Sequence, residues 1–196
     1  MKLHERLPDS VTAGGKTYRV DLDYRNVLRM IDVLGREEML PSAREYVALK
    51  CVMKRPPKNA GPVLAALRDV LFSADSEPAE QKLTDFEQDA DLIRAAFLQA
   101  FGINLWRDKV HWLEFTGLLG ALPEGSRYAD ILGIRARPMP KPTKYNAEER
   151  AWLAKAKLKH AVRMTEREAQ NKYSTDLQRI ATAMIGLAKK GGGDNA

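Results

Sequence analysis

The sequence predicts a mainly α-helical protein: a compact helical bundle with a short N-terminal β-hairpin and, after a proline-rich strap, a long C-terminal helix. Three observations predict this. Apolar residues recur at steps of three and four along most of the chain, as they do on one face of a helix. Two short runs flank Gly14-Gly15. Three prolines alternate within residues 136–145, and no proline follows them.

The N-terminal elements are indicated by turn and capping residues. Residues 7–12 and 16–20 form the predicted hairpin, because glycine reaches the positive φ that a tight turn requires. Asp21 or Asp23 then caps a helix that Gly35 ends. Its inward stripe is Tyr24, Val27, Leu28, Ile31 and Leu34.

Two further helices are expected before residue 73. Ser42 and Glu45 have the spacing of a capping box, which predicts a helix over residues 43–53 that two prolines stop. Pro62 fits the first position of a helix running to Phe72. Its inward residues are Val63, Leu67, Val70 and Leu71, and a polar surface loop follows over residues 73–82.

The central third of the chain carries two aromatic-rich helices, which we predict to pack antiparallel as the core. Thr84 and Glu87 form a capping box for the first helix, and Gly102 gives it a left-handed end. The two stripes are Phe86, Ala90, Ile93, Phe97 and Ala100, then Trp112, Phe115, Leu118, Leu119 and Leu122. One or two further helical turns are expected over residues 128–132.

Charge divides the chain. Residues 1–135 carry 19 Lys/Arg and 20 Asp/Glu, whereas residues 136–196 carry 13 and 6. We therefore predict a helical body with its hairpin over residues 1–135 and a stiff linker over residues 136–145. A basic helix over residues 146–190 and a disordered tail over residues 191–196 follow.

The second half of that basic helix has a regular apolar stripe. An exposed stripe of this kind docks either on its own body or on a partner, and the sequence does not choose between the two. The predicted partner-binding residues are Tyr173, Leu177, Ile180, Met184 and Leu187.

Several protein classes are disfavoured. No apolar run approaches the roughly 18 residues of a membrane span, and the first residues lack the apolar core of a signal peptide. The single cysteine, Cys51, is expected to be a buried thiol, so the predicted location is the cytoplasm. Phosphate-binding loops, zinc signatures and nucleophile motifs are missing, which predicts no enzyme, cofactor or metal. His111 with Glu114 gives too few ligands for a metal site.

Asp89 is the most informative polar residue, because it falls on or beside a buried stripe. A carboxylate there has to be paired, since desolvating it alone costs several kcal/mol. We expect Arg135, His111 or backbone N–H groups as partners. A pair that fixes how helices meet is favoured over an acid/base role, for which no second catalytic group can be named.

At these positions the sequence resembles a siphophage family, the bacteriophage gene-product-fifteen family, over about residues 7 to 137. The hairpin and the Tyr24–Leu28 segment are similar to the family's opening. Asn104 and Leu113 depart from the pattern, which has an acidic residue and an aromatic residue there. The residues that carry the resemblance include Phe86, Asp89, Ile93, Phe97, Gly102, His111, Trp112, Phe115, Leu119 and Arg135.

The resemblance implies a non-enzymatic tail assembly chaperone, since members are encoded just ahead of the tape measure gene. The implied partners are the tape measure protein and the major tail (tube) protein, met in the host cytoplasm. An apolar groove would cover exposed helical stripes of the long tape measure chain. Homo-oligomer formation is left open.

A nucleic-acid-binding phage protein is the competing reading. Basic residues on the last predicted helix are able to neutralise phosphates. No aromatic stacking platform or recognition-helix pattern accompanies them, which makes this reading the weaker one. The residues are Lys155, Lys157, Lys159, Arg163 and Arg167.

Overall fold

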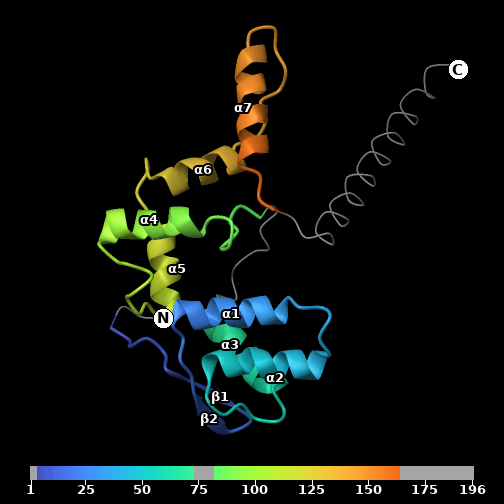
Figure 1. The fold of residues 1–196 in the computed structure, drawn as a ribbon, viewed down its shortest axis with the longest axis vertical. Coiled ribbons are helices and arrows are strands. Elements are labelled where there is room, and N and C mark those ends of the chain that lie inside the picture. The colour runs from blue at the N-terminus through green and yellow to red at the C-terminus, as the bar shows by residue number, and fades with distance from the viewer. Residues whose placement is uncertain (1–3, 73–81, 164–196) are drawn as a thin grey trace, which may run out of the picture. The chain divides into compact units, whose positions relative to one another are not determined.

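The computed structural model describes residues 4–72 and 82–163, which form seven α-helices and one two-stranded antiparallel hairpin. The predicted fold class, mainly helical with an N-terminal hairpin, is confirmed (Figure 1). The chain divides into two compact units, residues 1–141 and 142–196. The first unit holds the hairpin and helices α1 to α6. None of the described helices has the length and apolarity that crossing a membrane requires.

The hairpin joins β1 (Ser10–Ala13) to β2 (Lys16–Arg19). Its turn is made by Gly14 at φ 57 and Gly15 at φ 73, as predicted, because a side chain is strained in this left-handed region. Side chains alternate across the sheet, so Val11 is buried while Thr12, on the other face, is exposed.

Helix α1 spans Tyr24–Leu34, and the Asp23 carboxylate caps it by accepting a hydrogen bond from the Arg25 backbone N–H at 3.0 Å. Gly35 ends the helix, as predicted, and its own backbone is right-handed at φ −78. The predicted stripe is rotated, however, since Ile31 is 36% exposed. The buried face consists of Tyr24, Val27, Met30 and Val33.

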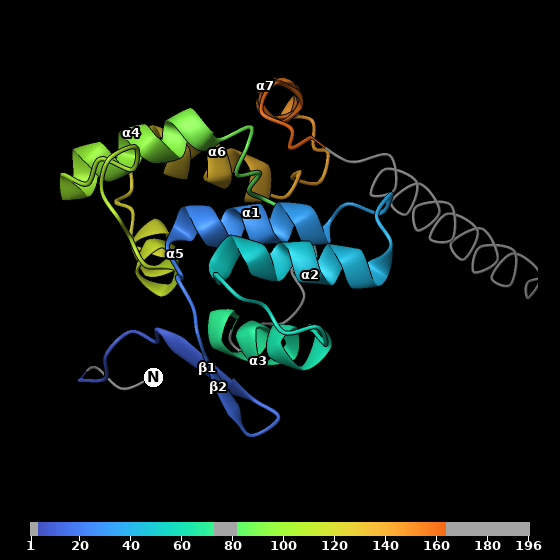
Figure 2. The same ribbon diagram turned by 60° about the horizontal axis from the view of Figure 1, so that its bottom comes forward.

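Helices α2 (Pro41–Val52) and α3 (Gly61–Leu71) follow. The predicted capping box at Ser42 is wrong, because α2 begins at Pro41, two residues before the predicted start, and no side chain caps it. Proline suits this first position, where its missing N–H would have no helical partner anyway. Figure 2 shows α1 and α2 side by side, with α3 between α2 and the hairpin.

Helices α4 (Ala90–Phe101), α5 (Trp112–Gly120) and α6 (Arg127–Ala136) complete the first unit. Gly102 ends α4 in the left-handed conformation at φ 69, as predicted. The capping box at Thr84 is wrong: residues 86–89 form turns, and Asp85 accepts from the next backbone N–H groups instead.

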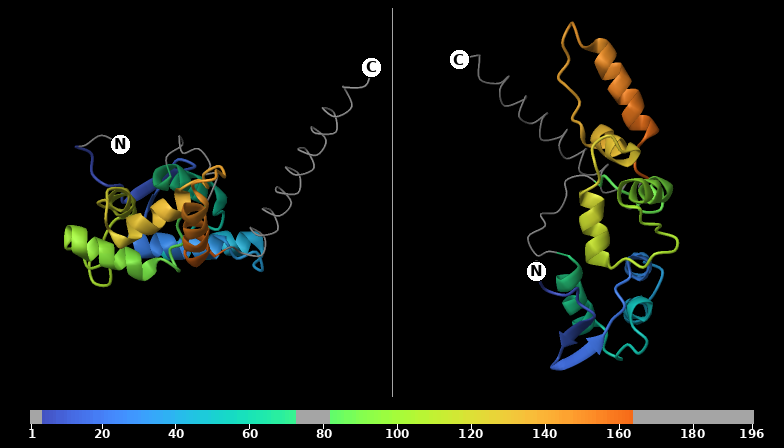
Figure 3. Two further views of the ribbon diagram at one scale, coloured as in Figure 1. Left: turned by 90° about the horizontal axis from the view of Figure 1, so that it is seen from above. Right: turned by 90° about the vertical axis from the view of Figure 1, so that its left-hand side faces the viewer.

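Helices α4 and α5 cross steeply, so the prediction of antiparallel packing is wrong (Figures 1 and 3). The reason lies in the link between them, which pairs with the start of α1. The Tyr24 N–H donates to the Val110 carbonyl at 2.9 Å, and the Trp112 N–H donates to the Leu22 carbonyl at 2.7 Å. This pairing, rather than α4, fixes the direction in which α5 sets out.

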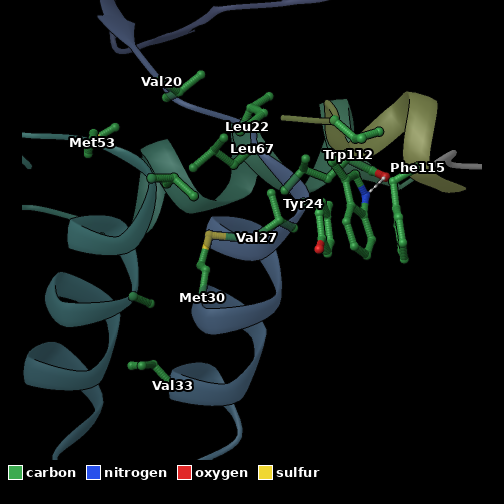
Figure 4. Packing of buried hydrophobic residues seen from close by; sticks show 14 of the residues in the cluster. Val20, Leu22, Tyr24, Val27, Met30, Val33, Met53, Leu67, Trp112 and Phe115 are labelled. Carbon is green, nitrogen blue, oxygen red and sulfur yellow. Dashed lines mark hydrogen bonds between the residues drawn. The ribbon is translucent and has the colours of Figure 1, made fainter. Parts of the chain in front are cut away.

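The core extends beyond the predicted helix pair into α1, α2, α3 and β1. Figure 4 shows Tyr24 of α1 beside the aromatic residues of α5, with Val27, Met30 and Val33 following along α1. The Trp112 indole N–H donates to the Leu71 carbonyl at 3.1 Å, which satisfies its polar atom inside the core. One apolar layer therefore connects all six helices of the first unit with the hairpin.

Helix α7 (Ala147–Lys159) belongs to the second unit. The predicted helix over residues 146–190 does not continue unbroken through the described residues, because residues 161–163, just after α7, are not helical. A helix in water depends on the packing of an apolar face. Residues 161–163 offer little such surface, because Val162 is the single large apolar side chain among them. Leu153 is the buried side chain of α7, whereas Trp152 is 56% exposed.

Candidate functional site

A buried ion pair joins the start of α4 to the last turn of α6. Asp89 is 1% exposed and Arg135 4%. The guanidinium donates to both carboxylate oxygens at 2.6 and 2.8 Å and to the Leu83 carbonyl at 2.7 Å. The Asp85 backbone N–H donates to the same carboxylate at 3.0 Å. Arg135 is thus the charged partner of Asp89, which confirms one of the partners expected from the sequence.

Two hydroxyl groups adjoin this pair. The Tyr128 and Thr84 oxygens lie 2.9 Å apart, and burial raises the pKa of Tyr128. The hydrogen bond with Asp89 raises the pKa of Arg135, so the guanidinium stays charged. In the described residues every buried side-chain polar atom has a partner. The cluster therefore resembles a helix-joining network more than an acid/base site.

An aromatic cluster surrounds Phe115. Its ring stacks on Tyr24 at a centroid distance of 4.7 Å, on Phe97 at 5.2 Å and on Trp112 at 5.9 Å. Phe86 completes the cluster from one side but remains 36% exposed. Of the other family-pattern residues, Ile93 is buried and Leu119 half-buried. These residues contribute to the interior of the first unit.

His111 acts as the cap of α5. Its Nδ1 accepts from the Leu113 backbone N–H at 3.2 Å, and its Nε2 then donates to the Pro8 carbonyl at 3.0 Å. Both ring nitrogens are used by the fold. No cluster of three or more metal-ligating side chains occurs in residues 4–72 and 82–163.

Cys51 is half-buried, which corrects the expectation of a buried thiol. It lies on α2 near the surface, with its sulfur 3.6 Å from the Val47 carbonyl. Burial still raises the pKa of the thiol, which disfavours the reactive thiolate.

One surface feature of the described residues that suits binding is a groove of ≈ 520 Å³ along α4, called the α4 groove below. Two large apolar side chains in it face solvent: Leu98 is 54% exposed and Trp106 70%. The Arg94 guanidinium lies 5.1 Å over the Trp106 ring. The groove is lined by Asp91, Arg94, Ala95, Leu98, Asn104, Leu105 and Trp106.

Local hydrogen bonds hold Trp106 in this exposed position. The Asn104 side chain accepts from the Trp106 backbone N–H at 3.1 Å, and Asp108 accepts from the Asn104 backbone N–H at 2.7 Å. Sequence reasoning missed the α4 groove. The available signals were a tryptophan within a polar link and Leu98 off the buried stripe of α4.

The C-terminal candidates are divided. Lys155 and Lys159 are exposed on α7, Lys157 is half-buried there, and Arg163 lies beyond the helix end. Arg167 is outside the described residues. The predicted partner-binding stripe, Tyr173, Leu177, Ile180, Met184 and Leu187, also lies outside the described residues.

Comparison with known proteins identifies a family match. A family model described as Bacteriophage Gp15 protein matches residues 3–162, which extends the resemblance past the proline strap and through α7. Neither a curated protein nor a solved structure matches the chain. Because the match covers most of the sequence, this chain belongs to the Bacteriophage Gp15 protein family.

Proposed function

We propose that this protein is a tail assembly chaperone-like protein without enzymatic activity, which binds the phage tape measure protein, the tail tube protein or both during tail morphogenesis. Family membership supplies the phage context. The observation that carries the proposal is the exposed apolar pair, Leu98 and Trp106, in the α4 groove.

The chemistry of this groove suits a helix. Tryptophan and arginine are enriched among the residues that dominate binding energies, and Trp106 already carries Arg94 on its face. An amphipathic helix presents apolar side chains three and four residues apart, which a groove with Leu98 and Trp106 on its walls would cover. The Asp91–Arg94 ion pair at 2.9 Å gives the same groove a polar rim.

Coexpression tests the proposal. The tape measure protein and the tail tube protein are each produced with and without this chain, and the soluble fraction of each is measured. We expect the soluble fraction of at least one to rise with the natural chain and to fall back with Leu98→Ser/Trp106→Ser. A matched control is Leu40→Ser/Tyr145→Ser, which also removes one leucine and one aromatic residue, at 75% and 85% exposure.

The control variant should behave like the natural chain. If neither tail protein becomes more soluble with the natural chain, the chaperone proposal is wrong. If both double variants lose the effect equally, the chaperone activity does not depend on the α4 groove.

Nucleic-acid binding through α7 is the second candidate. Its support is that Lys155 and Lys159 are exposed on the same helix as Trp152, an aromatic ring 56% exposed. Fluorescence anisotropy with single- and double-stranded oligonucleotides at rising salt tests it. Binding that weakens steeply with salt and is lost in Lys155→Glu/Lys159→Glu would support this candidate. Binding unaffected by that variant would exclude α7 as the site.

A further inference from the structure

A second groove lies between strand β2 and the C-terminal end of α2, well apart in sequence from the α4 groove. It has a volume of ≈ 730 Å³ and is called the β2 groove below. One wall is residues 17–21, and the other is residues 50–55, with Asn26 between them. Buried Val20, Val52 and Met53 contribute an apolar floor.

The backbone of β2 presents a free edge to this groove. The Val20 N–H donates to the Asp9 carbonyl at 2.8 Å, and Tyr18 lies opposite Val11 in the register. Backbone groups point to alternate sides along an antiparallel strand. The backbone N–H and C=O groups of Tyr18 and Val20 therefore face β1, whereas those of Thr17 and Arg19 face outward, away from β1. No described residue outside the hairpin makes a backbone hydrogen bond to those outward groups.

Pairing on this outer side has already begun at one end. The Asp21 N–H donates to the Val52 carbonyl at 2.7 Å, and Met53 is extended at φ −147 and ψ 145. The chain then turns away, so the edge beside Thr17 and Arg19 is left to the groove. An exposed edge of this kind is a template for another extended chain.

The charges around the β2 groove are strongly one-sided. Four cations, Arg19, Lys50, Lys54 and Arg55, line it against one carboxylate, Asp21. All four cations are exposed. Lys50 also complements the helix dipole in the last turn of α2, but Lys54 and Arg55 lie beyond that turn and have no such role.

We propose that the β2 groove binds an extended, acidic segment of a partner protein, which adds to β2 as a third strand. Main-chain hydrogen bonds to Thr17 and Arg19 would supply affinity, as in other cases of strand addition. Acidic side chains of the segment meet the four cations, and alternate apolar side chains lie on the floor made by Val52 and Met53. A nucleic acid satisfies the charge but not the alternating N–H and C=O groups of the strand edge.

Fluorescence anisotropy with four labelled probes tests the proposal on the full chain. The probes are a short peptide alternating Glu and Val, the matching peptide of Lys and Val, and a single-stranded oligonucleotide of equal charge. A fourth probe is the Glu/Val peptide with alternate backbone amides methylated, which removes the hydrogen bonds to the strand edge while keeping the charge.

Two variants and one control accompany the probes. Thr17→Pro removes an outward N–H without touching a ladder bond, since proline is tolerated at such edge positions. Lys50→Glu/Lys54→Glu/Arg55→Glu reverses the groove charge. Arg68→Glu/Arg107→Glu/Arg127→Glu makes the same charge change with three exposed arginines that do not line the groove.

We expect the Glu/Val peptide to bind the natural chain and the control, and to bind both groove variants roughly tenfold more weakly or worse. The Lys/Val and methylated peptides should not bind. Protection of the Arg19 amide from hydrogen exchange on adding the Glu/Val peptide would mark the new strand. Strand addition would be overturned if the methylated peptide bound as tightly as the Glu/Val peptide, or if the oligonucleotide bound more tightly than the Glu/Val peptide. Either result would mean that the groove binds through charge alone. Since neither variant alters the α4 groove, this outcome is independent of the chaperone assay.

Discussion

Two regions of the first unit are held together in different ways. Helices α1, α2 and α3 meet through aliphatic side chains such as Val27, Leu49 and Leu67, each fully buried. Helices α4 and α6 are joined by the buried Asp89–Arg135 ion pair. Apolar contacts are non-directional and tolerate substitutions that conserve volume. An ion pair requires both partners, so the two regions should fail under different substitutions.

The largest effect is expected from Arg135→Met, which leaves the Asp89 carboxylate buried and unpaired. Removing one partner of a buried pair costs about 3–5 kcal/mol, and urea unfolding measures this loss. The double variant Asp89→Leu/Arg135→Met should recover most of the stability, because it buries no charge.

An exposed pair provides the control for this comparison. The Arg68 guanidinium lies 3.4 Å from the Asp69 carboxylate, and the two side chains are 73% and 71% exposed. Arg68→Met should change the free energy of unfolding by less than about 1 kcal/mol. If Arg135→Met is equally mild, water enters the pair and the contrast between the two regions is lost.

Leu49 tests the aliphatic region. Leu49→Ala leaves a cavity between α1 and α2 and should cost about 2–5 kcal/mol by urea unfolding. Leu49→Met keeps the volume and should cost less than about 1.5 kcal/mol. If both variants lowered the free energy of unfolding equally, the packing around Leu49 would depend on side-chain shape and not on volume alone. The aliphatic region would then be as intolerant of substitution as the ion pair.

Asp23 should make the stability depend on pH. Burial acts to raise its pKa, but hydrogen bonds from the Arg25 side chain and backbone outweigh this, so the pKa of Asp23 is lowered from 3.8. The unfolded chain therefore binds the proton more readily. The stabilisation is present above pH 3.8 and is lost as the pH falls through the lower folded value.

Asp23→Asn removes this contribution, at a cost near neutral pH of about 1 kcal/mol. Urea unfolding from neutral to acid pH should give a shallower decline for the variant than for the natural chain. Parallel declines would show that other carboxylates, such as Asp85, cause the acid sensitivity, since its pKa is also lowered.

Local rules predicted the features that depend on a few adjacent residues. The glycines of the hairpin and Gly102 adopt the conformations that only glycine takes without strain. The pairing of Asp89 was predictable in kind because a carboxylate on a buried stripe has to be paired. Which partner it takes depends on how α6 packs, and the sequence narrowed this only to Arg135, His111 or backbone groups.

The errors arose where residues distant in sequence compete. Thr84 has the spacing of a helix cap, but its hydroxyl pairs with Tyr128, 44 residues away. The direction of α5 follows from backbone pairing between Tyr24 and Val110, which no periodicity records. The α4 groove was missed for a similar reason, since hydropathy does not tell which large apolar side chains stay exposed.

The smallest effect on stability is expected from Leu98→Ser/Trp106→Ser. Both side chains are more than half exposed, and the contact of Trp106 with Arg94 contributes little at the surface. The free energy of unfolding should change by less than about 1 kcal/mol, measured beside Leu49→Ala. A small change, together with loss of the coexpression effect, would separate a binding surface from the packed interior. A loss as large as that of Leu49→Ala would instead make the α4 groove part of the core.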